Sequence, residues 1–235
     1  MKSVLHKAAD RGHADHGWLN AWHSFSFANY HDPAKVHFGV LRVLNDDTIA
    51  AGMGFGAHPH DNMEIITIPL SGELEHRDSM GNTGIIHKGE VQVMSAGTGI
   101  QHSEKNKSLH EPLKLLQIWV FPDKKNVKPR YDQRNFDLDQ ARNKLLTIVS
   151  PMGDSEGLNI HQNAWFSLGK MEKEKSIHYT LKDKNNGVYA FIIDGTVTIN
   201  NEQLEKRDAI GITDAPELEI KAMSDAEILL MEIPV

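Results

Sequence analysis

Apolar residues recur along the whole chain in short runs separated by polar turns, many of which contain glycine. In the first half the runs cover residues 38–44, 63–70, 73–78, 91–94 and 115–121. In the second half they cover residues 145–149, 160–168, 188–193, 196–199, 209–212, 217–222 and 228–233. Short strands at close, regular spacing with glycine turns are typical of antiparallel sandwiches and barrels. The pattern therefore predicts an all-β protein.

Single residues within these runs refine the prediction. The polar tripeptide Asn45-Asp46-Asp47 is expected to end the first strand as a turn. Pro69 predicts an edge position or a bulge for the strand at 63–70, because proline cannot donate a hydrogen bond to a neighbouring strand. The alternation at 22–27 indicates a strand or an extended arm with its aromatic side chains on one side.

A charged stretch at 123–143 separates two halves that have a similar order of elements. We interpret this stretch as an interdomain connector with one short helix, which gives expected domains of residues 1–130 and 131–235. Each half contains an apolar strand that leads into a glycine turn, at Ser71-Gly72 and at Asp194-Gly195. The repeated order predicts an internal duplication.

Composition excludes several classes of function. The net charge of −7 argues against direct binding to nucleic acid or to an anionic membrane surface. No apolar run is long enough to cross a bilayer, and residues 1–6 lack the apolar core of a signal peptide, so a cytoplasmic protein is expected. The chain has no cysteine, so a metal ion would have to be bound by histidine and carboxylate.

Two pairs of ligand-type residues, each separated by one residue, suggest such a metal site. They are His58 with His60, and His102 with Glu104, and glycines precede both pairs. Residues i and i+2 of a strand share a face, so three imidazoles and one carboxylate converge if the two strands lie together. This donor set suits one divalent first-row ion: Fe, Cu, Ni, Mn, Co or Zn. An ion that prefers five or six ligands would keep positions for water, substrate or oxygen.

The remaining histidines are interpreted as structural. With 14 histidines in the chain, some close pairs arise by chance. His13, His16 and His23 fit no single strand face and are expected to pin the N-terminal segment by hydrogen bonds. His161 and His178 lie far apart, with no ligand two residues later, so the second domain is predicted to have no metal site.

The motifs around these residues resemble those of the cupins, small double-stranded β-helix barrels of the jelly-roll type. The passage Gly52-x5-His58-x-His60-x3-Glu64 resembles the first cupin motif, although the next glycine comes one residue later than usual. The second cupin motif is present only loosely, because its usual proline is absent. The fold class that this resemblance implies is two cupin-type β-barrel domains.

A more specific set of motifs is similar to the pirin family, and closely to the shorter bacterial pirin-like proteins described as quercetin 2,3-dioxygenases. The motifs span about residues 11–122, and the strand-rich second half fits the bicupin layout of that family. They are Trp22-His23-Ser24-Phe25-Ser26-Phe27-Ala28-Asn29-Tyr30, Arg42-Val43-Leu44-Asn45-Asp46-Asp47, His58-Pro59-His60, Ala96-Gly97-x-Gly99-Ile100-x-His102-Ser103-Glu104 and Leu116-Gln117-Ile118-Trp119.

The resemblance implies that His58, His60, His102 and Glu104 are the metal ligands, in agreement with their spacing. It also implies that Glu64, a ligand in the general cupin motif, supports the site without binding the ion. The chemistry known for the family implies a dioxygenase that opens flavonols such as quercetin with O₂, giving a depside ester and carbon monoxide. Glu104 is then expected to take the proton of the flavonol 3-hydroxyl group, while the metal ion brings substrate and oxygen together.

Two alternatives stay open at this point. Some pirins are described as transcriptional cofactors or as partners of metabolic enzymes, which implies a metal-binding regulatory protein with protein partners. A metalloenzyme acting on another enol-like substrate is the second alternative. A dry apolar pocket beside the metal would favour an enzyme, and a sealed site would favour the regulator. We expect Phe25, Phe27, Phe55 and Met63 to line that pocket, and the resemblance implies a monomer.

Overall fold

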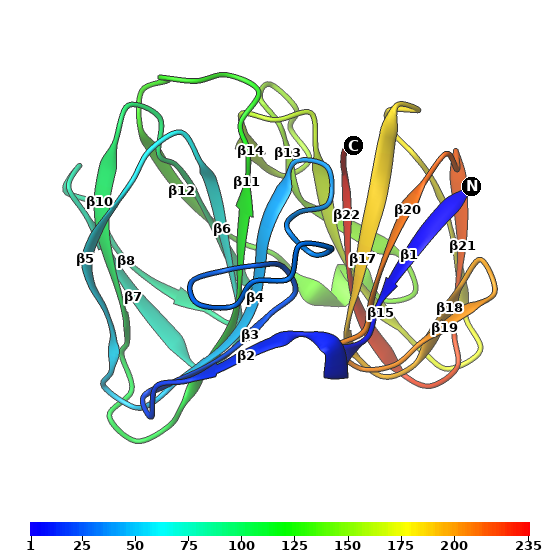
Figure 1. Ribbon diagram of the computed structural model, residues 1–235, viewed down its shortest axis with the longest axis horizontal. Helices are drawn as coiled ribbons and strands as arrows, with labels where there is room; N and C mark the ends of the chain where they lie inside the picture. Colours follow the sequence, from blue (N-terminus) through cyan, green and yellow to red (C-terminus); the bar gives the residue numbers. More distant parts are fainter.

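The computed structural model describes residues 1–235 and contains strands β1 to β22 and two short 3₁₀ helices, η1 (Ala8–Asp10) and η2 (Leu138–Ala141). The strands form two barrels that lie side by side (Figure 1). The predicted all-β fold is confirmed. Neither helix has the length or apolar character needed to span a bilayer.

The first barrel packs a sheet of seven strands against a sheet of four. In the larger sheet the order is β12 (Arg130–Asn135), β9 (Glu90–Ser95), β6 (Glu64–Ser71), β11 (Leu113–Val120), β4 (Leu41–Ile49), β3 (Leu19–His23) and β2 (Gly12–Asp15). In the smaller sheet it is β5 (Gly54–His60), β10 (Ile100–Asn106), β7 (Glu73–Asp78) and β8 (Thr83–His87).

The second barrel repeats this arrangement. Its larger sheet has the order β1 (Lys2–His6), β20 (Ala209–Thr213), β17 (Asn186–Asp194), β22 (Ala226–Pro234), β15 (Trp165–Met171), β13 (Leu145–Pro151) and β14 (Leu158–Ile160). Its smaller sheet has the order β16 (Ser176–Thr180), β21 (Glu217–Ala222), β18 (Val197–Ile199) and β19 (Glu202–Leu204).

One edge strand of each larger sheet comes from the other side of the predicted domain boundary. β12, which follows the other strands of the first barrel in sequence, pairs with β9. β1, at the start of the chain, pairs antiparallel with β20 of the second barrel, and Figure 1 shows the two strands side by side. The division into residues 1–130 and 131–235 stays a prediction. β12 lies almost entirely after this boundary but pairs with the first barrel, and β1 lies before it but pairs with the second.

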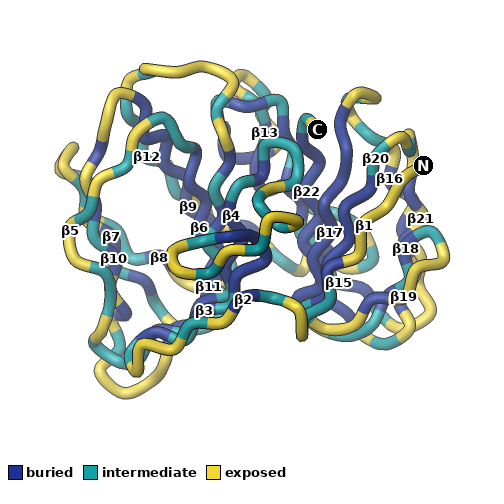
Figure 2. Tube along the Cα trace, in the orientation of Figure 1, coloured by how far each residue is buried: buried dark blue, intermediate teal, exposed yellow.

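The largest apolar cluster lies between the barrels rather than inside either one. It joins residues on the outer faces of the two larger sheets, such as Leu44 and Ile118 from the first and Tyr189 and Leu229 from the second. All four side chains are buried, and the strands that carry them form the buried middle of the molecule in Figure 2. Because this apolar area is removed from water only when the barrels meet, it holds the two together.

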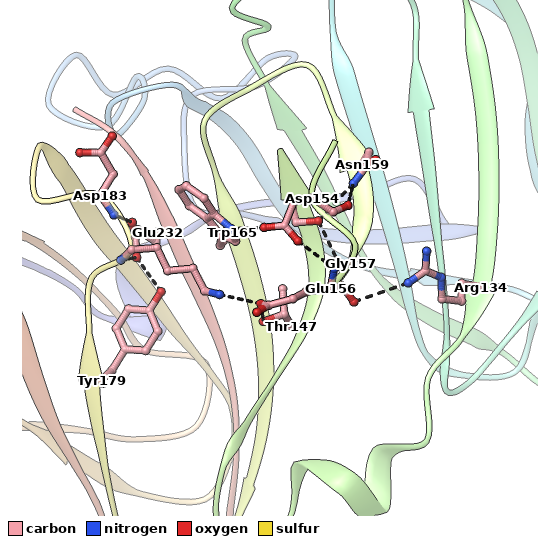
Figure 3. Close-up of polar contacts among 12 residues, drawn as sticks. Arg134, Thr147, Asp154, Glu156, Gly157, Asn159, Trp165, Tyr179, Asp183 and Glu232 are labelled. Carbon is pink, nitrogen blue, oxygen red and sulfur yellow. Dashed lines mark hydrogen bonds and ion pairs between the residues drawn. The ribbon is translucent and has the colours of Figure 1, made fainter. Parts of the chain in front are cut away.

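Polar contacts from both ends of β12 also link the two barrels. Arg130 donates to the carbonyl oxygen of Asn159, and Arg134 lies 3.5 Å from the carbonyl oxygen of Glu156. Figure 3 shows Arg134 reaching toward the loop that carries Glu156. In the second barrel behind this loop, the buried carboxylate of Glu232 accepts a hydrogen bond of 2.6 Å from the hydroxyl of Tyr179.

Several local predictions need correction. β4 does not end at Asn45-Asp46-Asp47 but continues to Ile49, because Asn45 and Asp47 are buried inside the first barrel. The run at 160–168 is interrupted: β14 ends at Ile160 and β15 begins at Trp165. The charged connector contains a strand, β12, as well as the short helix η2. Pro69 does sit beside an irregularity, since the register between β6 and β11 shifts next to it.

Candidate metal centre

Strands β5 and β10 bring the three predicted histidines together. The two strands are antiparallel neighbours, with His58 opposite His102 and His60 opposite Ile100. The Nε2 atoms of His60 and His102 are 3.0 Å apart, and the ring centroids of His58 and His102 are 4.4 Å apart. One ring nitrogen from each histidine lies within 4.8 Å of the others. The convergence expected from the i, i+2 spacing is therefore present.

Glycine and a backbone irregularity shape this meeting point. A Cβ atom on Gly54 would lie 2.1 Å from the carbonyl oxygen of Glu104, so only glycine allows β5 to approach β10 this closely. The register between the two strands shifts between His102 and Glu104. The Nδ1 atom of His58 is 2.8 Å from the carbonyl oxygen of Gly56, which directs the opposite nitrogen of that ring toward the cluster.

The surroundings of His60 and His102 keep these two imidazoles neutral. Burial, followed by the neighbouring charge of His58, lowers the pKa of His60 to about 4. Burial and the other histidines lower the pKa of His102 to about 2. A neutral imidazole has a free lone pair, which is what a metal ion requires. Three imidazole nitrogens, with the carboxylate of Glu104 on the strand of His102, therefore fit a divalent first-row ion.

Glu104 lies beside this cluster rather than within it. Its carboxylate forms a second group with His76 and His102, in which one ligand-type atom of each residue lies within 4.8 Å of the others. Gln117 Nε2 donates to both carboxylate oxygens, at 3.1 and 3.3 Å. Burial raises the pKa of Glu104 to about 7, although hydrogen bonds from Gln117 and Thr67 oppose the shift. The carboxyl group can therefore hold or release a proton near neutral pH.

An open cleft of about 760 Å³ leads from solvent to His58 and His60. This volume is within the range of roughly 300–1,000 Å³ that is usual for small-molecule sites. Trp119 and Met63 contribute apolar surface, and the Trp119 ring packs edge-on against His60 with centroids 4.9 Å apart. The cleft is neither sealed nor filled by protein. A smaller cavity of about 170 Å³ between the barrels contains no histidine, so we assign the chemistry to the open cleft.

The four residues expected to line the pocket have different positions. Met63 lines the cleft. Phe27 packs edge-on against Trp119 with centroids 5.4 Å apart, so it supports the wall from behind. Phe55 lies beside His58 at 6.2 Å, whereas Phe25 is buried between the barrels against Tyr189.

Glu64 lies outside both ligand groups. It is buried and accepts a 2.7 Å hydrogen bond from Ser95. The histidines interpreted as structural also lie outside them: His13 stacks on Trp22, and His23 bonds to Asn45. His178 is exposed and pairs with Glu217 at 3.1 Å. His16 and His161 likewise belong to neither group.

The sequence interpretation missed two residues next to the site. Trp119 was noted only as part of a motif, although its ring forms a wall of the cleft. His76 was overlooked, although it is fully buried beside His102. A usable signal was present, because His76 and Asp78 form a third i, i+2 pair of ligand-type residues on a predicted strand.

Comparison with known proteins agrees with this geometry. Residues 4–120 match the family profile described as pirin, and residues 147–233 match that described as the quercetinase C-terminal cupin domain. The chain is 46% identical over 231 residues to quercetin 2,3-dioxygenase of Escherichia coli (strain K12), which covers 98% of both chains. The crystal structure of YhhW from Escherichia coli superposes with a TM-score of 0.95 at 44% identity and covers 100% of this chain and 99% of that one. A structure of bacterial pirin YhhW in complex with nickel(II) gives a TM-score of 0.93 at 43% identity, with 99% of each chain covered.

Proposed function

The chain belongs to the pirin family, and from that premise we propose that it is a metal-dependent quercetin 2,3-dioxygenase. The observation that carries the proposal is the convergence of His58, His60 and His102 at the base of an open cleft. An open cleft admits a small aromatic substrate and O₂, whereas a regulator with a sealed site would need neither.

We assign the metal ligands to His58, His60, His102 and Glu104. The three imidazoles form one group, and Glu104 follows His102 by two residues on the same buried strand face. When bound, the ion would supply Lewis acidity and a template for substrate and O₂. All four side chains belong to the first barrel of one chain, which supports a catalytic monomer.

Glu104 has the properties required of the base in this reaction. The 3-hydroxyl group of a flavonol must lose its proton before the ring is electron-rich enough to react with O₂. Burial raises the carboxyl pKa to about 7 in the metal-free protein, and an ion bound beside it would lower this pKa and favour the ionised form that a base requires. Gln117, which donates to both carboxylate oxygens, holds the group in place. The cleft wall at Trp119 and Met63 would bind the flavonol ring by apolar and aromatic contact.

Oxygen uptake with quercetin tests the proposal. Protein reconstituted separately with Ni²⁺, Co²⁺, Mn²⁺, Fe²⁺, Cu²⁺ and Zn²⁺ should consume O₂ with at least one ion, and should release carbon monoxide and the depside. His58→Ala should abolish uptake, whereas His178→Ala, which removes an exposed histidine of the second barrel, should retain it. Tight metal binding without uptake for any ion would reject the activity.

Glu104→Gln separates the base from the ligand set. The variant keeps the shape of the side chain but cannot accept the proton, so it should bind metal and lose about 10²-fold or more in turnover. Full turnover in this variant would reject Glu104 as the base.

A further inference from the structure

A histidine that binds a metal through one nitrogen needs an acceptor for the N–H of the other, because that hydrogen bond fixes the tautomer and aims the ring. His58 has such an acceptor in the carbonyl oxygen of Gly56. His102 directs Nε2 toward His60, but its Nδ1 is buried without any hydrogen-bond partner in the protein. Leaving a buried donor unpaired is destabilising, so a neighbouring group is expected to accept its hydrogen bond.

The nearest such group is His76 on β7. β7 is the neighbour of β10, with His76 opposite Glu104 and Asp78 opposite His102. The rings of His76 and His102 have centroids 5.3 Å apart, and one nitrogen of each lies within 4.8 Å of the other. His76 is 0% exposed, and its own Nδ1 is also buried without a partner. The interior of the barrel therefore holds two unpaired Nδ1 atoms on adjacent rings.

The surroundings of His76 fix which of its nitrogens carries the proton. Its Nε2 lies 3.3 Å from Oδ2 of Asp78, a carboxylate that also accepts from the side chain and backbone of Asn82 and the backbone of Met80. A carboxylate can only accept, so Nε2 of His76 donates. In a neutral imidazole that donates from Nε2, Nδ1 is left as an acceptor.

The ring of His76 is held in one orientation from its other face. Tyr131 of β12 stacks on it with centroids 4.7 Å apart and an interplanar angle of 27°. Gly84 lies opposite His76 on β8, and a Cβ atom there would lie 2.6 Å from the Tyr131 hydroxyl oxygen. The absence of a side chain at Gly84 thus makes room for the stacked ring. Glu104 accepts from Gln117 and is assigned to the ion, so His76 is the acceptor for His102 that has no other role in the site.

We infer that His76 is a positioning residue for the metal centre: its Nδ1 accepts the Nδ1–H of His102, directly or across one ordered water. The series of hydrogen bonds from Asp78 through His76 to His102 then keeps Nε2 of His102 free of a proton and directed at the ion. The inference rests on the proposed function only in that His102 is a ligand. It assigns to His76 no contact with metal or substrate.

Two substitutions at His76 test the inference. His76→Phe keeps a ring to stack on Tyr131 but removes both nitrogens, and His76→Asn restores an oxygen near the position of Nδ1. His178→Phe, at an exposed site in the second barrel, is the control for loss of a histidine. Three quantities are measured: ring ¹⁵N chemical shifts in metal-free and Zn²⁺-loaded protein, Ni²⁺ affinity by competition with a chelator, and the melting temperature.

The wild-type protein should show His76 protonated on Nε2 and His102 protonated on Nδ1. In His76→Phe the proton of His102 should redistribute between its nitrogens, and Ni²⁺ affinity should fall by about 10–100-fold. His76→Asn should recover most of that loss, and the control should match wild type. A melting temperature that falls equally in both His76 variants, with His102 protonation and Ni²⁺ affinity unchanged, would assign His76 a packing role and overturn the inference.

The outcomes also separate this inference from the proposed function. Wild-type protein that binds no Ni²⁺ would reject the metal centre, and the ring shifts of the metal-free protein would still report the bond between His76 and His102. A His76 ring protonated on Nδ1 would overturn the positioning role, even if metal binding and quercetin turnover are intact.

Discussion

The two barrels pair their strands in the same order, so each position in one barrel can be matched to a position in the other. The match starts from Gly72, which follows β6, and Gly195, which follows β17. Gly72 and Gly195 both have positive φ, and a shift in strand register precedes each of them. Matched in this way, polar positions inside the first barrel correspond to apolar positions inside the second. The matched pairs are Thr67 with Ala190, Gln92 with Ile210, Gln117 with Leu230, His76 with Ile199, His102 with Leu218 and Glu104 with Ile220.

The barrels also differ in how completely their buried polar atoms are paired. Eight buried side-chain atoms lack a hydrogen-bond partner, and all of them belong to residues 24–119. In the second barrel, the one fully buried carboxylate, Glu232, accepts from the Tyr179 hydroxyl, the Asn186 amide and the backbone N–H groups of Lys182 and Asp183. The same barrel architecture thus has two different roles in this protein. The saturated, apolar barrel contributes stability, and the polar barrel forgoes some stability to hold a site.

The largest effect should come from placing a residue of the first barrel at its match in the second. Leu230→Gln loses the burial of an apolar side chain and leaves an amide unpaired among apolar neighbours, at a cost of about 3–5 kcal/mol. Urea unfolding measures the loss, and Leu230→Met should cost less than about 1.5 kcal/mol. Equal stability of Leu230→Gln and wild type would show that the second barrel tolerates polar side chains as the first does.

Glu232→Gln tests whether the paired carboxylate stabilises the second barrel. The substituted amide turns one acceptor into a donor that faces other donors, so unfolding free energy should fall by about 1.5–3 kcal/mol. Glu217→Gln is the control: its carboxylate is exposed, and the change should stay within about 0.5 kcal/mol. Similar losses in both variants would count against a special role for Glu232.

Asp47→Asn should reveal the cost of a buried carboxyl group in the first barrel as a function of pH. Burial, and then the charges of Asp46 and Glu104, raise the pKa of Asp47 to about 8. The folded protein keeps this proton where the unfolded chain has lost it, so wild-type stability falls as pH rises from about 4 to about 8. The variant has no carboxyl group to titrate, so its stability relative to wild type should be unchanged near pH 4 and should rise steadily toward pH 8. A constant difference across thermal melts in this range would contradict the assignment.

The smallest effect should come from removing an unpaired polar group from the first barrel. Both amide atoms of Gln92 are buried without a protein partner. Gln92→Met keeps the length of the side chain and should leave stability unchanged or raise it by up to about 1 kcal/mol. The reverse change at the matched position, Ile210→Gln, should be clearly destabilising. A loss of stability in Gln92→Met would mean that the Gln92 amide is paired, for example through ordered water.

Strand periodicity was sufficient to predict the histidine cluster, because alternation places His58 with His60 and the ladder adds His102. It could not indicate that Glu104 accepts a hydrogen bond from Gln117, since Gln117 belongs to a strand of the opposite sheet. Asn45 and Asp47 were interpreted as a turn because such residues are usually exposed. Only a polar barrel interior allows them to remain within β4.

The two edge strands were not predicted for a related reason. β12 has the sequence Arg-Tyr-Asp-Gln-Arg-Asn and no apolar face. It forms a strand because the edge of β9 provides backbone hydrogen-bond partners for it. The first four residues of β1 are exposed, so its conformation depends on pairing with β20. A segment of this kind carries little local information, because its partner is remote in sequence.

The pairing of β1 with β20 has a consequence for biosynthesis. β1 leaves the ribosome well before its partner, because residues 209–213 follow it about two hundred residues later. At roughly 5–20 residues per second, this strand stays without its partner for on the order of 10 s or longer, during which the first barrel can already fold. An unpaired strand is open to pairing with other chains, and Val4 and Leu5 place one apolar side chain on each face of this one. Until β20 has been synthesised, β1 must therefore be protected from pairing with other chains.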